Sequence, residues 1–173
     1  MNLDMPIEQL VRRKGTRFQF GFATEARNLV PERGDFLLAT SHRGLHVLAR
    51  DEESLAPPIE ALREVYGPDL DVAPPRVRLI EGVQVQEPIM SVRISVETRF
   101  LEPVRKALRA RGVNASEEYV RARYCVLRYE APLASLLGLP GQLERLSMGT
   151  AKHWIVLSHY ALVTGGPGGG MAA

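Results

Sequence analysis

The chain has 173 residues, of which 45% are hydrophobic and 24% charged, and its formal net charge is +2. This composition is typical of one globular domain of ordinary size or of two small ones. No apolar run approaches the ~20 residues that a membrane-spanning helix needs, and the N-terminal segment has no apolar core of signal-peptide length, so we expect a soluble, cytoplasmic protein.

The first half of the chain predicts the order strand, short helix, strand, strand, helix, strand. Residues 1–14 are expected to form an N-terminal extension with a short helix, and the alternating TRFQFGF at 16–22 predicts the first strand. A short helix is expected in residues 23–34. The segments DFLLATS and RGLHVLARD then predict a hairpin, because the SHRG link between them ends in glycine.

A longer helix is expected in DEESLAPPIEALREVY. Asp51 is the candidate N-cap, and Pro57 and Pro58 suit the first turn of a helix better than its interior. Gly67 and Pro68 are typical of a helix end. The segment PRVRLIEG, residues 75–82, is expected to be the last strand of this half.

The second half repeats the same order of elements. PIMSVRISVE predicts a strand, and TRFLEPVRKALRARG predicts a helix with Thr98 as N-cap and Gly112 as its stop. The buried face of this helix is expected to consist of Leu101, Val104 and Leu108. Two strands in GVNASEEYV and RARYCVLRYEAP, a helical segment broken at residues 138–141, and a strand in GTAKHWIVLSHYALV complete the half.

Both halves therefore predict an α+β fold of two tandem ferredoxin-like (split βαβ) domains, each an antiparallel sheet with helices on one face. The domains are expected at residues 15–84 and 85–164. They follow the extension at 1–14, and the glycine-rich segment 165–173 is expected to be a disordered tail.

Positive charge is concentrated in the second half, where residues 88–173 hold 11 basic and 6 acidic side chains. Nineteen of the 22 basic residues are arginine, whose planar fork binds two phosphate or carboxylate oxygens at once. Codon usage in a GC-rich genome explains the arginine excess equally well. The candidate contact residues for RNA phosphates lie on the predicted helix and the strand beside it: Arg105, Lys106, Arg109, Arg111, Arg121 and Arg123.

The spacing of the arginines supports this candidate surface, but a simpler interpretation accounts for the same residues. Arg105 and Arg109 are four residues apart on one helix face, and Arg121 and Arg123 are expected to share one sheet face. Alternatively, the helix face is solvated and partly paired with Glu102 and Glu117.

Aromatic side chains offer a second kind of RNA contact. Tyr124, Trp154 and Tyr160 are the candidates in the second half for base stacking on an exposed sheet, as in RNA-recognition motifs of similar topology. The sequence signature of those motifs is absent, and positions in the core or between the two halves are the alternative.

The second half resembles the C-terminal (fifth) domain of translation elongation factor G in EPIMSVRI, the RARG helix end, APLASLLG, LERLSMGTA and SHYALV. The first half is similar to the third domain of that family in RGLHVLA and YGPDLDVAPPRVRLIEG. The resemblance implies two ferredoxin-like domains without the GTPase domain. The fourth domain of the family would lie between the halves, which residues 82–87 join directly.

The sequence shows no pattern typical of catalysis. It has no G-x-x-x-x-G-K-[ST] phosphate loop, no guanine-reading motif and no G-x-S-x-G elbow, so we expect no enzyme, no catalytic residue and no cofactor. The four histidines, His42, His46, His153 and His159, lack the spacing of a metal site. Cys125 is expected to be a small apolar core residue.

The sequence thus predicts a non-catalytic module, and the resemblance implies that it associates with the ribosome or with translation through a basic face. Ribosomal RNA or a ribosomal protein would be the partner. The alternative is a protein–protein assembly or regulatory module that keeps the elongation-factor fold as a scaffold. An enzyme with an unrecognised site is a third hypothesis.

Overall fold

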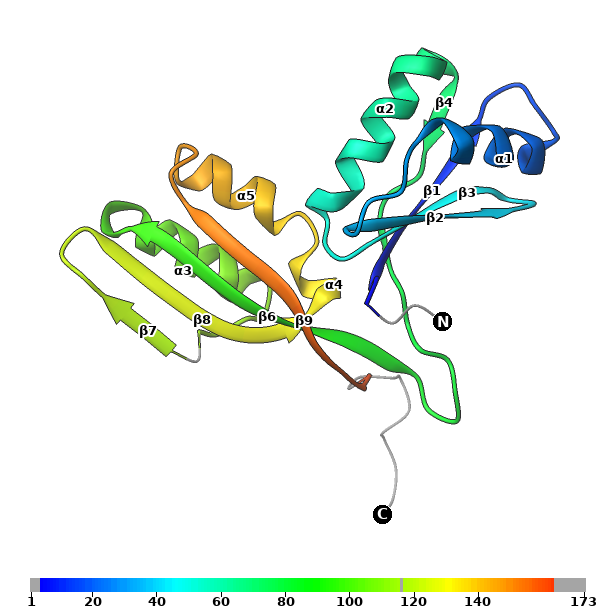
Figure 1. The fold of residues 1–173 in the computed structure, drawn as a ribbon. Helices are drawn as coiled ribbons and strands as arrows, with labels where there is room; N and C mark the ends of the chain where they lie inside the picture. The colour runs from blue at the N-terminus through cyan, green and yellow to red at the C-terminus, as the bar shows by residue number, and fades with distance from the viewer. Residues whose placement is uncertain (1–3, 116, 164–173) are drawn as a thin grey trace.

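The structure is a computed structural model that describes residues 4–115 and 117–163. It contains two α+β domains that follow one another along the chain (Figure 1). The expected glycine-rich tail at 165–173 lies outside the described residues. No described helix is long and apolar enough to cross a membrane.

The first domain is an antiparallel sheet of strand order β2-β3-β1-β4, with the short β5 also paired to β1. Two helices, α1 and α2, complete it (Figure 1). The elements are β1 (Ile7–Arg13), α1 (Gln19–Leu29), β2 (Phe36–Ser41), β3 (Gly44–Ala49), α2 (Ala56–Tyr66), β4 (Leu70–Val72) and β5 (Arg76–Val77).

The sequence prediction for residues 7–22 is wrong. Residues 7–13 form the central strand β1 instead of a helix in an extension, and residues 16–22 form the loop and first turn of α1 instead of a strand. Ile7 and Val11 are fully buried, and the polar Gln9 between them bonds the carbonyl oxygen of Ala73 (2.7 Å). The two apolar residues Ile7 and Val11 are four positions apart, and this spacing resembled that of the apolar face of a helix. Conversely, Phe18 and Phe20 are exposed, so the alternation in TRFQFGF did not reflect burial.

The fourth strand lies earlier than expected and is interrupted. β4 and β5 pair with opposite ends of β1, and of the predicted strand at 75–82 only Arg76–Val77 forms a named strand. Pro74 and Pro75 lie between β4 and β5. Proline has no N–H to donate to the ladder and is confined to sheet edges and bulges, which explains both the interruption and its place at the edge.

Helix α2 ends as the sequence predicts, but it begins at Ala56 rather than directly after Asp51. Prolines occupy its first turn, and its C-cap Gly67 has a φ of 53°, a left-handed conformation that favours glycine. Asp51 caps the preceding 3-10 turn rather than α2 itself, because its Oδ1 accepts the backbone N–H of Ser54 (2.8 Å). The ring of Tyr66 packs edge-on against Phe22 of α1, with centroids 5.1 Å apart.

The second domain repeats the topology of the first. Its antiparallel sheet has the order β7-β8-β6-β9, which is again second, third, first and fourth strand in chain order. This confirms the predicted pair of ferredoxin-like folds. The elements are β6 (Gln86–Glu97), α3 (Leu101–Ala110), β7 (Glu117–Val120), β8 (Tyr124–Pro132), α4 (Leu133–Leu136), α5 (Leu139–Leu146) and β9 (Lys152–Leu162).

The helices of the second domain lie along one side of its sheet (Figure 1). Leu101, Val104 and Leu108 of α3 are buried, as predicted. Thr98 lies in a 3-10 turn and makes no side-chain cap bond, so the prediction of Thr98 as N-cap is wrong. Gly112 follows the helix with a φ of 74°. Gly138, with a φ of 76°, separates α4 from α5.

The other side of this sheet is open. Along β8, Cys125, Leu127 and Tyr129 are buried, whereas Tyr124 and Arg128 alternate with them and are exposed. Alternation with a period of two is what a strand shows when one face covers a core and the other meets solvent. We call this solvent-facing side of the β7-β8-β6-β9 sheet the open face.

The first hairpin gives a sharp test of the fold. Gly44 opens β3 with a φ of 138°, and a Cβ there would collide with the carbonyl oxygen of Val11. Gly34 has ordinary backbone geometry and open space around it. We expect Gly44→Ala to lower the free energy of unfolding by about 2 kcal/mol, and Gly34→Ala to change it by less than about 0.5 kcal/mol. Urea denaturation measures both, and equal effects would contradict this backbone geometry.

Candidate functional site

The described histidines and the cysteine do not assemble a metal centre. Within residues 4–115 and 117–163, no group of three or more His, Cys, Asp or Glu is placed to hold a metal ion. His46 bonds Ser41 (2.8 Å), and His153 bonds Glu53 (2.8 Å). These two rings therefore have partners within the fold.

Cys125 is a core residue, as predicted. Its side chain is fully buried, and its Sγ lies 3.5 Å from Oε1 of Glu118. Desolvation, followed by the hydrogen bond and charge of Glu118, raises the pKa of the Cys125 thiol to about 11. A nucleophilic cysteine needs a lowered pKa, so this environment favours the unreactive thiol.

Two of the six predicted contact residues are occupied within the protein. Arg105 bonds Glu102 on its own helix and Glu118 on β7, and its side chain is only 29% exposed. The alternative interpretation of a paired helix face is thus correct for Arg105 and Glu102. Glu118 is the second partner described, and the side chain of the expected Glu117 lies outside those that the structure describes.

Arg111 holds the connection between α4 and α5. Its guanidinium donates to the carbonyl oxygens of Ser135 (3.0 Å) and Leu137 (2.8 Å) and to Oε1 of Gln142 (2.9 Å). Because these bonds use the donors on one planar fork, Arg111 is a structural residue rather than a contact for a partner.

The other four predicted residues are exposed but do not form one patch on a helix and a strand. Lys106 and Arg109 lie on α3, and the side chain of Arg109 is 65% exposed, 4.0 Å from Glu102. Arg121 and Arg123 lie in the turn between β7 and β8, so the predicted common strand face is wrong. The turn is closed by the N–H of Arg121, which donates to the carbonyl of Tyr124 (2.8 Å).

A hollow of about 500 Å³ lies on the open face beside this turn. It is lined by Arg93, Ser95, Tyr119, Arg121, Tyr124, Val126 and Arg128. Three of these residues are arginines and two are tyrosines, and none of the described lining residues is acidic. The hollow is therefore the place on the second domain where cationic and aromatic side chains meet.

Register explains how distant segments converge on the hollow. On the central strand β6, Arg93 lies opposite Arg128 of β8 and opposite Trp154 of β9. The guanidinium of Arg93 lies over the Trp154 ring, 4.9 Å from its centroid, and that of Arg128 lies 5.8 Å from the centroid of Tyr119. Two arginine–aromatic pairs thus lie side by side across the sheet.

Arg93 was missed by the sequence analysis, and Arg128, although it alternates with apolar residues in the same predicted strand as Arg121 and Arg123, was not among the candidate contacts. Each arginine lies between two core residues of a predicted strand, so alternation alone places both on the solvent side. Of the predicted stacking residues, Tyr124 and Trp154 are each 48% exposed on the open face. Tyr160 is partly buried instead, and burial raises its pKa.

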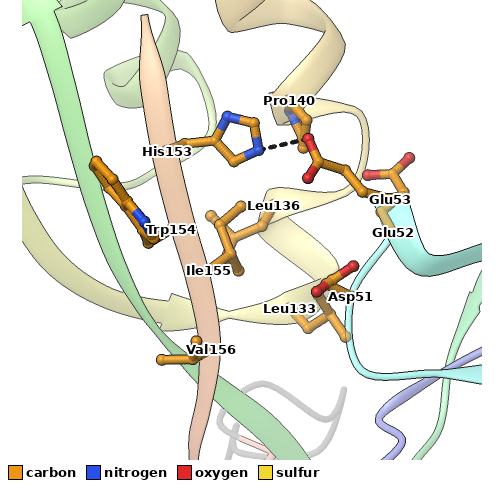
Figure 2. Close-up of a pocket in the computed structure, with 10 residues that line it drawn as sticks. All are labelled: Asp51, Glu52, Glu53, Leu133, Leu136, Pro140, His153, Trp154, Ile155 and Val156. Atoms are coloured by element: carbon orange, nitrogen blue, oxygen red, sulfur yellow. Dashed lines mark ion pairs between the residues drawn. The ribbon is translucent and has the colours of Figure 1, made fainter. Parts of the chain in front are cut away.

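A second hollow, of about 210 Å³, lies between the two domains (Figure 2). Figure 2 shows Glu53 of the first domain pointing at His153, with Leu136 and Ile155 forming an apolar wall. Glu52 accepts the backbone N–H of Gly138 at the start of α5 (2.8 Å). Both carboxylates have partners in the other domain, so this hollow is part of the joint between the domains. Figure 2 also shows that Trp154 projects from the opposite side of β9.

These features define the chain as a two-domain α+β protein whose second domain carries exposed cationic and aromatic side chains. Residues 84–168 match the family model described as Elongation factor G C-terminus. The second domain is therefore similar to that family, which confirms for this half the resemblance stated from the sequence.

Comparison with solved structures shows that the two-domain fold occurs elsewhere. A crystal structure of a protein from Thermus thermophilus matches with a TM-score of 0.64 and 14% sequence identity. The match covers 91% of this chain but only 41% of that one. At this identity the likeness shows the fold alone. No curated protein matches the sequence.

Arg111 and Lys106 provide a matched test of which basic residues build the fold. Arg111→Ala leaves two carbonyl oxygens and a glutamine without their charged donor, so we expect it to lower the free energy of unfolding by about 2 kcal/mol. Lys106→Ala, on the exposed side of α3, should change it by less than about 0.5 kcal/mol. Chemical denaturation of both variants measures the difference. Similar values would show that Arg111 is not structural.

Cys125 should react with a thiol reagent only when the domain unfolds. At pH 8 we expect negligible labelling by Ellman's reagent in the native protein and full labelling in denaturant, because burial protects a thiol whose pKa is raised to about 11. Since the folded pKa lies above the ordinary value of 9.0, the stability that the neutral thiol contributes is present below pH 9 and is lost as pH rises towards 11. Rapid labelling of the native protein would contradict this assignment.

Proposed function

We propose that this protein is a non-catalytic, translation-associated module that binds the ribosome through the cationic surface of its second domain. The observation that carries the proposal is the hollow on the open face, which three arginines line and no described acidic side chain enters. The similarity of the second domain to that family supports the translational context. Ribosomal RNA is the proposed partner, and the cytoplasm the proposed location.

Arginine chemistry supports contact with phosphate groups. A guanidinium fork binds two oxygens of one phosphate, and such charged hydrogen bonds are stronger than neutral ones. Arg93, Arg121 and Arg128 converge on the hollow from β6, the β7–β8 turn and β8. A phosphate there would meet donors from three segments of a rigid sheet.

The proposed contact set differs from the one that the sequence predicted. Arg121 is retained at the hollow, and Lys106, Arg109 and Arg123 remain exposed positive groups around the domain. Arg105 and Arg111 are excluded because they bond within the protein. Arg93 and Arg128 are the additions.

A protein–protein assembly module is the second candidate. Val120 and Val156 are well exposed on the two outer strands of the second domain, β7 and β9, and a protein partner would cover such apolar side chains. This candidate predicts dependence on the valines and tolerance of changes to the arginines, so the two functions separate in one series of variants.

Co-sedimentation with purified ribosomes tests the proposal. We expect the protein to pellet with ribosomes at about 50 mM salt and to bind roughly 20- to 40-fold more weakly at about 200 mM, as three phosphate contacts would require. The double variant Arg93→Glu/Arg128→Glu should reduce pelleting at least about tenfold, because it reverses two charges that face the phosphates.

Arg43→Glu/Arg63→Glu is the control, because both arginines are exposed in the first domain and the change in net charge is the same. It should leave pelleting near the level of the unmodified protein. Equal losses of pelleting in both double variants would show that net charge alone explains the effect. Pelleting that changes neither with salt nor with Arg93→Glu/Arg128→Glu would overturn the cationic site.

A further inference from the structure

We propose that the open face of the second domain binds single-stranded RNA, with unpaired bases stacked on its arginine–aromatic pairs and phosphates held by the arginines of the hollow. The choice of RNA rests on the proposed function. The mode of binding goes beyond it, since phosphate contact alone would serve double-stranded RNA equally well.

The aromatic rings are the first observation. Tyr119 is 53% exposed on β7, and Tyr124 on β8 and Trp154 on β9 are each about half exposed, all on the sheet side away from the helices. Large rings in such positions cost hydrophobic free energy unless a partner covers them. A flat base covers a flat ring completely, and base–aromatic stacking tolerates any base because each has a π-face.

The arginines extend the stacking surface. Arg93 lies over Trp154, and Arg128 lies near the Tyr119 ring at 5.8 Å from its centroid. A guanidinium plane laid on a ring is itself a flat surface on which an unstacked base can rest. Each pair therefore offers both a stacking plane and a phosphate donor within one nucleotide of each other.

The width of the sheet suits a short run of bases. The rings lie on β7, β8 and β9, and neighbouring strands are about 4.8 Å apart, so the outer rings are separated by roughly 14 Å. Four-stranded sheets of the same architecture stack two or three bases across this distance in RNA-recognition motifs. Bases inside a duplex are already stacked on each other and cannot reach the rings.

Charge favours a nucleic acid over an apolar protein surface on this face. Lys152 lies opposite Ser95 in register and adds a fourth positive group beside the hollow. Among the acidic residues of this sheet, Glu97 pairs with Arg99 (2.7 Å), Glu130 accepts from the neutral Ser158 (2.7 Å), and Glu117 of β7 lies opposite Arg128 in register. The positive charge that a polyanion would meet on the open face is therefore carried mainly by Arg93, Arg121 and Lys152.

The single tryptophan provides a direct readout. Trp154 is the only tryptophan in the chain, so fluorescence reports on the open face alone. We expect a single-stranded RNA of about eight nucleotides to quench it at about 50 mM salt. An RNA duplex of the same length should bind at least about tenfold more weakly, because its bases are not available for stacking.

Variants separate stacking from charge. Tyr119→Ala and Tyr124→Ala should each weaken binding of the single strand about five- to 100-fold, the loss typical of one stacked base. Phe18→Ala, which removes an exposed ring from the first domain, should leave binding unchanged. Thermal unfolding of each variant checks that the second domain remains folded, and Tyr124→Phe should retain stacking.

Parallel ribosome pelleting distinguishes the two proposals. In one outcome, ribosomes pellet the protein, single-stranded RNA does not quench Trp154 fluorescence, and the tyrosine variants bind the RNA as tightly as the unmodified protein does. This outcome overturns the stacking inference and leaves the proposed function standing. Binding of single strands without ribosome pelleting supports the inference and removes the ribosomal context. Equal affinity for duplex and single strand, or a dimer of this chain that hides Trp154, would also overturn stacking.

Discussion

The pairing register of β6 is the constraint on which the candidate site depends. β6 is the inner strand between β8 and β9, and its residues Val92 and Ile94 are buried against the helices. Because side chains alternate, the core contacts of these two residues force Arg93 to the open face between Arg128 and Trp154. A slip of one residue would bury the guanidinium, so the hydrophobic core itself specifies the position of the charge.

The same physics divides the arginines into those that build the protein and those that remain for a partner. Arg105 bonds two carboxylates and Arg111 bonds carbonyl oxygens within the protein, and these bonds connect α3 to β7 and hold the α4–α5 connection. Arg93 contacts an aromatic ring instead. A cation–π contact at an exposed site contributes only about 0.5–1 kcal/mol and leaves the guanidinium N–H groups available to bind oxygen.

Much of the fold could be predicted from the sequence, and the failures have physical causes. The alternation of apolar and polar residues and the glycines at helix ends predicted almost all elements of the second domain. In the first domain, the hydrogen bond of Gln9 placed a polar residue among core positions, and exposed Phe18 and Phe20 imitated a strand. The site was less predictable, because register between distant strands decides that Arg93 meets Arg128, and only the fold shows that Arg111 faces carbonyl oxygens.

The placement of Arg93 opposite Arg128 has an energetic consequence. Like charges at directly opposed positions destabilise a sheet by about 0.2–1 kcal/mol. This cost is similar in size to the stabilisation that an exposed cation–π contact contributes. Arg128 also lies opposite Glu117 of β7 in register, so its charge is not opposed by Arg93 alone, and the arrangement contributes little to stability. A phosphate beside Arg93 would add an attraction between opposite charges, while a base would cover the ring beside it. The observed pairing of charge and ring therefore gains more from a bound nucleotide than from the folded state alone.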